Sequence, residues 1–397
     1  MRHEAGTLFF LHALAILALV PGYLLWLRLA RRAAKHLPSL EGRTEISSAR
    51  VDVIVPVRDE AAWIEEKLRN LAALEEPAGG LAFWIVDGGS SDGTSEIAAS
   101  WSARDGRFHL LRDVSGGKVV ELNAALARCE AEWTLVTDAD ARLPSGVVLE
   151  MLRVAAGDPD LAVIGVPVEA SQAHVLDRMH WRALNAARRA EARLGSAAIV
   201  TAPCYLFRRD LLPTGFPDRV VADDVHIALV AAAAGKRVGF ADRPVVELRS
   251  PVRLAELFRH KVRKADAYLR EVLRFLPRLA SFPAPARAVF LWRAAQMICF
   301  PLATLGAAVA LAQWSATLGP EIAASLAAGS TALFGGDVVL AIRRGREPRL
   351  AIALALGALL AAVLLTALVT APLARRTARY PKVSTGPLAA WREGTGA

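Results

Sequence analysis

The sequence predicts an α/β domain with a mostly parallel sheet, flanked at both ends of the chain by transmembrane helices. Short apolar runs alternate with helical stretches between residues 51 and 250, and long runs without charge lie on either side of this region. The chain has 397 residues, of which 54% are hydrophobic and only 22% are charged. This composition excludes a disordered chain and is too apolar for a wholly soluble protein.

The net charge of +9 is concentrated in two stretches that border apolar runs. Residues 28–50 hold six Lys or Arg and two Glu, and residues 253–287 hold nine Lys or Arg and three acidic residues. Basic segments beside apolar runs are typical of cytoplasmic flanks that meet anionic lipid headgroups. We therefore expect a membrane bilayer as a partner and no nucleic acid.

Four apolar runs are long enough to cross a bilayer, which takes about 20 residues. They are the segment between Glu4 and Arg28, then residues 294–320, 322–342 and 350–374. The first run is too long for a cleaved signal peptide and lacks a small-residue cleavage site. Soluble helices of this length normally carry a polar stripe, which these runs lack. We expect one N-terminal span and about three C-terminal spans, with the central domain in the cytoplasm.

The region from residue 51 to 250 reads as alternating strands and helices. The expected strands are Val51–Val57, Phe83–Val86 and Trp133–Thr137, whose β-branched and aromatic residues are typical of buried parallel strands. The expected helices are Ala61–Leu74, Ser95–Arg104 and Lys118–Cys129. This alternation predicts a mostly parallel sheet covered by helices.

Acidic residues fall on three segments that we expect at strand ends, along the edge where open α/β sheets bind ligands. They are Asp87, the pair Asp138 and Asp140, and the pair Asp223 and Asp224. An aspartate after a strand is by itself typical of a turn or a helix cap. Several carboxylates together repel one another unless a cation lies among them. The pattern therefore indicates a site for a divalent cation with an anionic ligand.

Six motifs follow one another between residues 51 and 270. They are Val53-Ile54-Val55-Pro56-Val57-Arg58-Asp59-Glu60, Val86-Asp87-Gly88-Gly89-Ser90-Ser91-Asp92-Gly93, Gly117-Lys118, Thr137-Asp138-Ala139-Asp140, Ala222-Asp223-Asp224 and Arg259-His260-Lys261-Val262-Arg263-Lys264. In type and order this series resembles the motifs of family 2 glycosyltransferases, which have the GT-A fold. The resemblance implies an inverting enzyme that moves a hexosyl or related sugar from a nucleotide-sugar donor.

The resemblance also implies roles for individual residues. The implied donor-binding residues are Pro56, Val57, Arg58, Glu60, Asp87, Lys118, Asp138, His260, Arg263 and Lys264. Among them, Asp87 would bind the nucleotide base. Asp138 and Asp140 would engage the donor diphosphate through Mg²⁺ or Mn²⁺. Asp224 resembles the catalytic base, with Asp223 beside it where the family usually has Glu.

One departure from the family bears on the product. Lys264 stands where processive polysaccharide synthases of the family have Trp, so we expect transfer of one or a few sugars to a lipid-linked or membrane-embedded acceptor. Three alternatives remain open, which are a processive polysaccharide synthase subunit that extends a glycan, a sugar nucleotidyltransferase and a non-catalytic scaffold. The basic stretch from residue 253 predicts an amphipathic helix, either at the membrane interface or simply on the domain surface.

The predicted organisation has four parts. They are an N-terminal transmembrane helix with a basic linker (1–50), a GT-A domain (51–250), basic interfacial helices (251–287) and C-terminal transmembrane helices with a tail (288–397). We expect an integral protein of a bacterial inner membrane whose catalytic domain faces the cytoplasm.

Overall fold

A seven-stranded sheet forms the centre of the molecule, in the strand order β3-β2-β1-β4-β8-β6-β9. The computed structural model describes residues 2–33, 49–170, 172–195, 197–200, 202–247, 249–318, 320–343 and 347–372. Strand β8 is antiparallel to both of its neighbours, and the other pairs in the sheet are parallel. The prediction of a mostly parallel sheet is confirmed, although the sequence pattern did not reveal the reversed strand.

The strand bounds match the sequence prediction closely at β1, β2 and β4. The large sheet consists of β1 (Val51–Val57), β2 (Leu81–Asp87), β3 (Phe108–Leu111), β4 (Trp133–Thr137), β6 (Leu161–Gly165), β8 (Cys204–Arg208) and β9 (Arg237–Phe240). A second sheet consists of β5 (Ala141–Arg142), β10 (Val245–Glu247) and β7 (Val168–Glu169), in that order.

Both faces of the large sheet are buried because successive side chains of a strand point to opposite faces. In β1, Val53 and Val55 join one apolar core with Ile64 of α3, whereas Ile54 joins a second core with Leu122 of α5. Burying each such side chain stabilises the fold by about 1.5–3 kcal/mol. The helices are α3 (Ala61–Ala72), α4 (Thr94–Arg104), α5 (Lys118–Leu126), α6 (Val147–Ala156), α7 (Val175–Ala192), α8 (Asp223–Ala233) and α9 (Leu254–Phe275).

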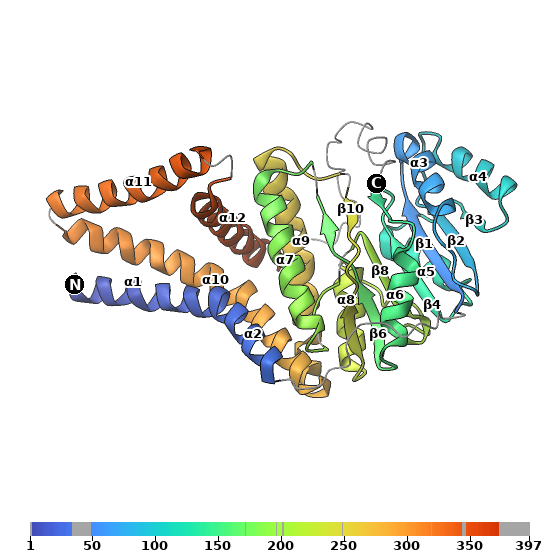
Figure 1. Cartoon of the computed structure of the whole chain (residues 1–397), viewed down its shortest axis with the longest axis horizontal. Helices are drawn as coiled ribbons and strands as arrows, with labels where there is room; N and C mark the ends of the chain where they lie inside the picture. Colours follow the sequence, from blue (N-terminus) through green and yellow to red (C-terminus); the bar gives the residue numbers. More distant parts are fainter. Residues whose placement is uncertain are drawn as a thin grey trace.

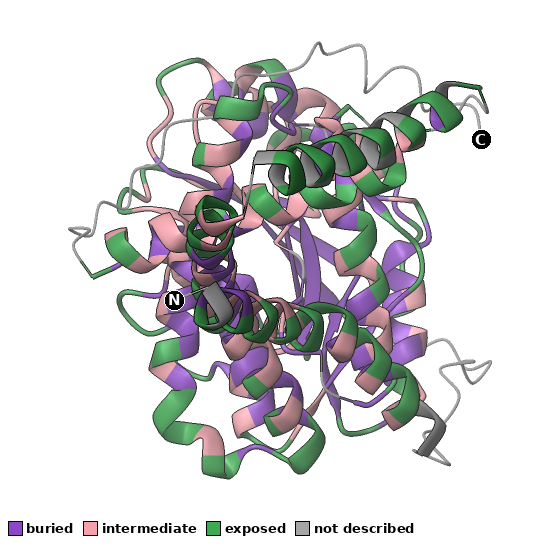
Figure 2. Cartoon of the chain, turned by 90° about the vertical axis from the view of Figure 1, so that its left-hand side faces the viewer, coloured by how far each residue is buried: buried purple, intermediate pink, exposed green. Residues whose placement is uncertain are grey.

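The remaining helices project from one side of the α/β domain (Figure 1). They are α1 (Arg2–Leu17), the π-helical turn η1 (Ala18–Gly22), α2 (Tyr23–Ala33), α10 (Ala284–Thr317), α11 (Pro320–Arg343) and α12 (Arg349–Thr370). Helices α1 and α10 lie side by side (Figure 1). Seen from that side, the projecting helices are largely exposed (Figure 2), with Phe10, Leu14 and Val369 each more than 60% accessible. Such apolar exposure is typical of surfaces that contact a membrane or another protein.

Within the described residues, three helical segments are long and apolar enough to cross a membrane. They are Glu4–Ala30, Ala284–Thr317 and Arg349–Thr370. Helix α11 is not among them, so the fourth predicted span stays a prediction. Helix α10 begins at Ala284, before the boundary predicted at residue 288. Residues 34–48 of the predicted basic linker and the predicted tail after residue 372 are not among the described residues.

Buried polar contacts join the first and second candidate spans to the α/β domain. Glu191, near the end of α7, accepts a hydrogen bond of 2.6 Å from the Tyr23 hydroxyl. The same Oε1 atom lies 2.5 Å from Nη2 of Arg293 on α10. On α10, Gln296 also donates to the Leu19 carbonyl at 2.7 Å, within the π-helical turn that contains Pro21. A buried ion pair such as Arg293–Glu191 is costly to break, so it fixes the domain against the candidate spans.

Helix α9 contacts both the α/β domain and α12. Its Ala265, together with the partly buried Phe258 and Val262, packs against Val363 and Ala367 of α12. Helix α9 also contacts α8. The predicted basic helix is therefore in contact both with α8, which begins at the Asp223–Asp224 pair, and with a candidate span.

Candidate functional site

Lys118 brings two of the three acidic segments together at one edge of the sheet. Its Nζ atom lies 2.9 Å from Asp138 Oδ1 and 3.2 Å from Asp223 Oδ2. Asp138 directly follows β4, as expected. Asp223 and Asp224 do not follow a strand, so that expectation was wrong, and they open helix α8 instead. Acidic residues are favoured in a first helical turn because they face the positive end of the helix dipole.

The two adjacent aspartates are held differently. Asp223 accepts a hydrogen bond of 2.6 Å from the Tyr205 hydroxyl through the same oxygen that faces Lys118. Asp224 accepts a longer hydrogen bond of 3.2 Å from the Tyr268 hydroxyl. Burial, together with the charge of Asp223, raises the pKa of Asp224 to about 6. Asp224 is thus the less firmly engaged carboxylate and the one better suited to take up a proton.

Lys67 supports the turn that carries Asp138 and Asp140, and the sequence pattern did not single it out. Its side chain is fully buried on α3, and its ammonium donates to Thr137 Oγ1 at 2.9 Å and to the Ala141 carbonyl at 2.6 Å. Burial lowers the pKa of Lys67 to about 8. Lys67 therefore fixes Thr137 and Ala141, the residues on either side of the Asp138–Asp140 turn.

Replacing Lys67 with Met is expected to lower the free energy of unfolding by about 1–3 kcal/mol, because two buried oxygens lose their donor. The shifted turn should also weaken cation-dependent nucleotide binding. Chemical denaturation in detergent and calorimetry with a nucleoside diphosphate and Mn²⁺ measure the two effects. Lys236→Met is the control, since Lys236 is partly exposed and pairs with Asp160 at the surface. Equal stability of the two variants would contradict the supporting role.

Asp87 lies at the end of β2, opposite Val57 of β1. Its carboxylate accepts hydrogen bonds from the Ser90 amide at 2.9 Å and from the Ser90 hydroxyl at 2.5 Å, and it also accepts one from the Ser95 hydroxyl. These bonds fix the carboxylate and the turn that follows the strand. The predicted base-binding residue is thus held rigidly at the carboxyl edge of the sheet.

Residues after β1 form the neighbouring part of the predicted nucleotide pocket. Pro56 and Val57 end the strand, and Arg58 is 40% exposed beside Asp59, whose φ of 48° is left-handed. Glu60 is buried in a two-bond pair with Arg249, whose guanidinium lies 5.0 Å from the Trp63 ring centroid. Arg249 was missed by sequence reasoning because this pair joins residues 189 positions apart.

A steric constraint favours glycine at position 88, directly after Asp87. A Cβ atom at Gly88 would overlap Oε1 of Glu121, so the Glu121 carboxyl occupies the space of a side chain at position 88. Burial raises the pKa of Glu121 to about 7. Glu121 is a second residue that the motif comparison did not identify. It follows Lys118 on α5, and only the packing of α5 against β2 brings it to Gly88.

The basic motif lies on α9. Arg263 donates to Nδ1 of His260 at 3.3 Å. Burial and the neighbouring charges of Lys264 and Arg263 lower the pKa of His260, so the imidazole stays neutral and accepts this bond. Lys264 lies 5.4 Å from the ring centroid of Trp181 on α7. The three predicted residues therefore share one face of α9, with Lys264 directed toward α7.

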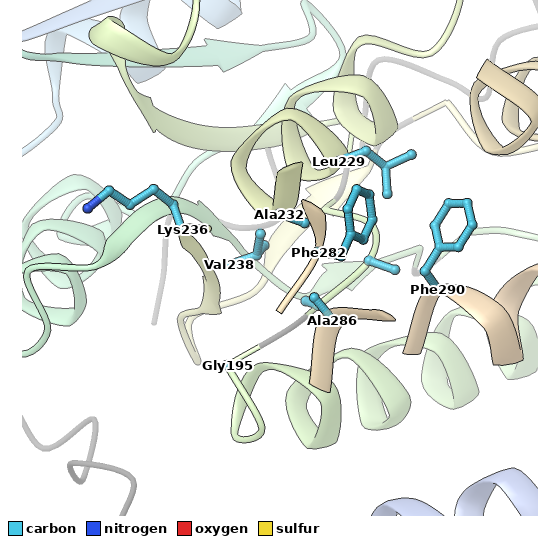
Figure 3. A pocket seen from close by; sticks show the side chains of 10 residues that line it. Gly195, Leu229, Ala232, Lys236, Val238, Phe282, Ala286 and Phe290 are labelled. Carbon is cyan, nitrogen blue, oxygen red and sulfur yellow. The ribbon is translucent and has the colours of Figure 1, made fainter. Parts of the chain in front are cut away.

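Two pockets elsewhere contain none of the predicted site residues. The first is small and mainly apolar, and lies between α8, β9 and the start of α10 (Figure 3). The second is lined by residues such as Cys129, Arg209 and Asp210, at the amino end of β4. Ligands of open α/β sheets bind at the opposite edge, so neither pocket is a candidate for the chemistry.

The acidic turn after β4 fits a divalent cation that is bound together with a ligand. In the described part of the chain, no group of three or more His, Cys, Asp or Glu side chains is arranged to hold a metal. Mg²⁺ is commonly held by one or two carboxylates together with substrate phosphates. Asp138 and Asp140 supply such a pair, and phosphate oxygens of a donor would complete the shell.

Residues 52–216 match the family model described as glycosyl transferase family 2. The chain carries a family 2 glycosyltransferase domain. It is 26% identical over 278 residues to an N-acetylglucosaminyltransferase of Neorhizobium galegae, covering 64% of this chain and 62% of the relative. It is 35% identical over 105 residues to a beta-monoglucosyldiacylglycerol synthase of Trichormus variabilis, covering 26% of this chain and 22% of the relative.

A solved structure supports the GT-A fold of this glycosyltransferase domain. A mannosyltransferase from Pyrobaculum calidifontis, in complex with GDP-Man and Mn²⁺, superposes with a TM-score of 0.71 at 26% identity. The match covers 92% of this chain and 99% of that one, so it extends well beyond the α/β domain. The chain spans less than two thirds of the length of the curated relatives named above.

Proposed function

We propose that this chain is an inverting glycosyltransferase of the bacterial inner membrane, with its catalytic domain in the cytoplasm. It transfers a sugar from a nucleotide-diphosphate sugar to a hydroxyl of a lipid-linked or membrane-embedded acceptor. The observation that carries the proposal is the bridge by which Lys118 joins the acidic turn after β4 to the Asp223–Asp224 pair. This bridge would bring the phosphates of the donor and the carboxylate that deprotonates the acceptor to the same edge of the sheet.

The chain's own residues account for the steps of a single displacement. Asp87 and the residues after β1 hold the nucleotide, and Lys118 and Arg263 offer positive charge to the diphosphate. A divalent cation on Asp138 and Asp140, Mg²⁺ or Mn²⁺, would supply charge neutralisation for the leaving group. Asp224 takes the proton of the acceptor hydroxyl as it attacks. One displacement of this kind inverts the anomeric centre and needs no second nucleophile.

Two similarities support the choice of substrates. The Pyrobaculum enzyme was solved with a nucleotide-sugar and Mn²⁺, which supports a donor of that class. The name of the Trichormus relative describes a glucosylated diacylglycerol, which supports a lipid acceptor. The contacts of Glu191 with Tyr23 and Arg293 hold the α/β domain beside the spanning helices, where such an acceptor resides.

The product distinguishes this proposal from its alternatives. The purified full chain is incubated with radiolabelled GDP-mannose or UDP-N-acetylglucosamine, Mn²⁺ and bacterial lipid extract. We expect label in an organic-extractable product of low mass and release of nucleoside diphosphate. Label retained as high-mass material would establish a processive synthase, and release of pyrophosphate a nucleotidyltransferase. A protein that turns over none of a full panel of nucleotide-sugars would be a scaffold.

A further inference from the structure

Three cations surround a buried indole near the Asp223–Asp224 pair. Arg188 on α7 and Lys261 and Lys264 on α9 lie 5.8, 5.6 and 5.4 Å from the ring centroid of Trp181. We call these three residues the cation cluster. Trp181 itself is 6% exposed, and its indole N–H has no hydrogen-bond partner in the described part of the chain. Because cations cover the ring, it is unsuited to stacking on a sugar.

Only one member of the cation cluster is neutralised by an ion pair within the described residues. Lys261 Nζ lies 2.5 Å from Asp177 Oδ1. Arg188 is 2% exposed, and its Nε and Nη1 atoms are buried without a hydrogen bond to any described group. Lys264 has no carboxylate within ion-pair distance among the described residues. Among the described residues, Arg188 and Lys264 therefore both contact the Trp181 ring without a carboxylate in ion-pair contact, although the charge of each acts on Asp224.

A buried guanidinium without a hydrogen-bonded partner is costly to a folded protein. Asp224 and Glu191 are the carboxylates whose charge acts on Arg188, but they accept hydrogen bonds from other side chains, Asp224 from Tyr268 and Glu191 from Tyr23. Burial lowers the pKa of Arg188, as expected for a charge that the protein compensates incompletely. An arginine retained under these conditions indicates an anionic ligand.

The cation cluster lies where the domain meets the spanning helices. Glu191, one helical turn beyond Arg188 on α7, contacts Tyr23 and Arg293 of two candidate spans. Ala265, next to Lys264 on α9, packs against α12. An anion that reaches both Arg188 and Lys264 is therefore at the membrane side of Asp224. This location favours a lipid headgroup over a soluble metabolite.

We propose that Arg188 and Lys264 bind the phosphate of the acceptor lipid, and that this contact presents the lipid's free hydroxyl to Asp224. This assigns Lys264 to the acceptor, whereas the family resemblance implied that it binds the donor. The inference rests on the proposed function and narrows its acceptor to lipids whose polar end carries both a phosphate and a hydroxyl. The planar guanidinium matches phosphate oxygens in a two-bond geometry, and the ammonium adds a point charge. In this proposal the phosphate serves only for recognition of the lipid. The attacking group is the hydroxyl, because a hydroxyl needs a base such as Asp224 to remove its proton.

Lipid binding tests the proposal without turnover. The full chain in neutral detergent is titrated with dioctanoyl phosphatidylglycerol, with dioctanoylglycerol and with inorganic phosphate, and binding is read by native mass spectrometry. Wild-type protein should prefer the phosphatidylglycerol. Arg188→Met should weaken that binding by about 10–100-fold, the effect of losing a charged hydrogen bond. Arg189→Met is the matched control, because Arg189 faces outward and pairs with Asp242, and it should bind like wild type.

Three outcomes would overturn the proposal. Inorganic phosphate that binds as tightly as the lipid would identify a soluble anion as the ligand. Weaker binding of GDP or UDP with Mn²⁺ to Arg188→Met, with lipid binding unchanged, would assign Arg188 to the donor. A lower melting temperature of lipid-free Arg188→Met with unchanged lipid binding would assign it a structural role. Our proposal predicts the reverse, a higher melting temperature, because an incompletely compensated buried charge is removed. None of these readouts depends on sugar transfer. A failure of this proposal can therefore be distinguished from a failure of the proposed function.

Discussion

Replacing Asp224 with Asn is expected to reduce turnover by about 10²–10⁴-fold, the range typical of losing a general base. Asn keeps the shape of the side chain and can still accept a hydrogen bond from Tyr268, so the fold and donor affinity should be retained. Steady-state kinetics and calorimetric donor binding on the same preparation measure the two quantities. The control is Asp223→Asn, since Asp223 is held by Tyr205 and Lys118. A greater loss of turnover in Asp223→Asn would reverse the assignment within the pair.

The pH profile gives an independent check on Asp224. Its pKa is raised to about 6, first by burial and then by the charge of Asp223, so the carboxylate is protonated below that pH and cannot accept a proton. Turnover of the wild type should therefore fall as the pH drops through about 6, by tenfold per pH unit at the low end. The residual turnover of Asp224→Asn should lack this limb. An identical acid limb in both proteins would identify another group as the base.

Replacing Asp140 with Asn is expected to abolish the cation-dependent part of nucleotide binding. Loss of even a residue that supports a metal ligand typically costs about 10–100-fold in metal affinity, and loss of the ligand itself should cost at least as much. Calorimetry of a nucleoside diphosphate with and without Mn²⁺ measures the effect. Asp160→Asn is the control, because Asp160 is an exposed carboxylate paired with Lys236. Unchanged affinity in the presence of Mn²⁺ would remove Asp140 from the metal site.

Local sequence features accounted for much of the fold and part of the candidate site. Buried strands such as Val51–Val57 are rich in β-branched residues, and a carboxylate directly after a strand lies at the carboxyl edge whatever the rest of the chain does. Asp87 and Asp138 were therefore positioned correctly from their neighbours alone. Asp223 and Asp224 were not, because the chain enters α8 from an irregular segment that has no periodic pattern.

The sequence by itself determined the alternation of strands and helices, the long apolar helices and the family motifs, since each depends on residues a few positions apart. Only the tertiary structure decided which distant charges meet. Glu60 pairs with Arg249, Lys118 joins Asp138 to Asp223, and Glu191 joins α7 to Tyr23. The same holds for Arg188, whose buried Nε and Nη1 atoms have no hydrogen-bond partner among the described residues because of how α7, α9 and α10 pack. Periodicity fixes which face of a helix is buried, but the packing of helices against one another fixes what that face touches.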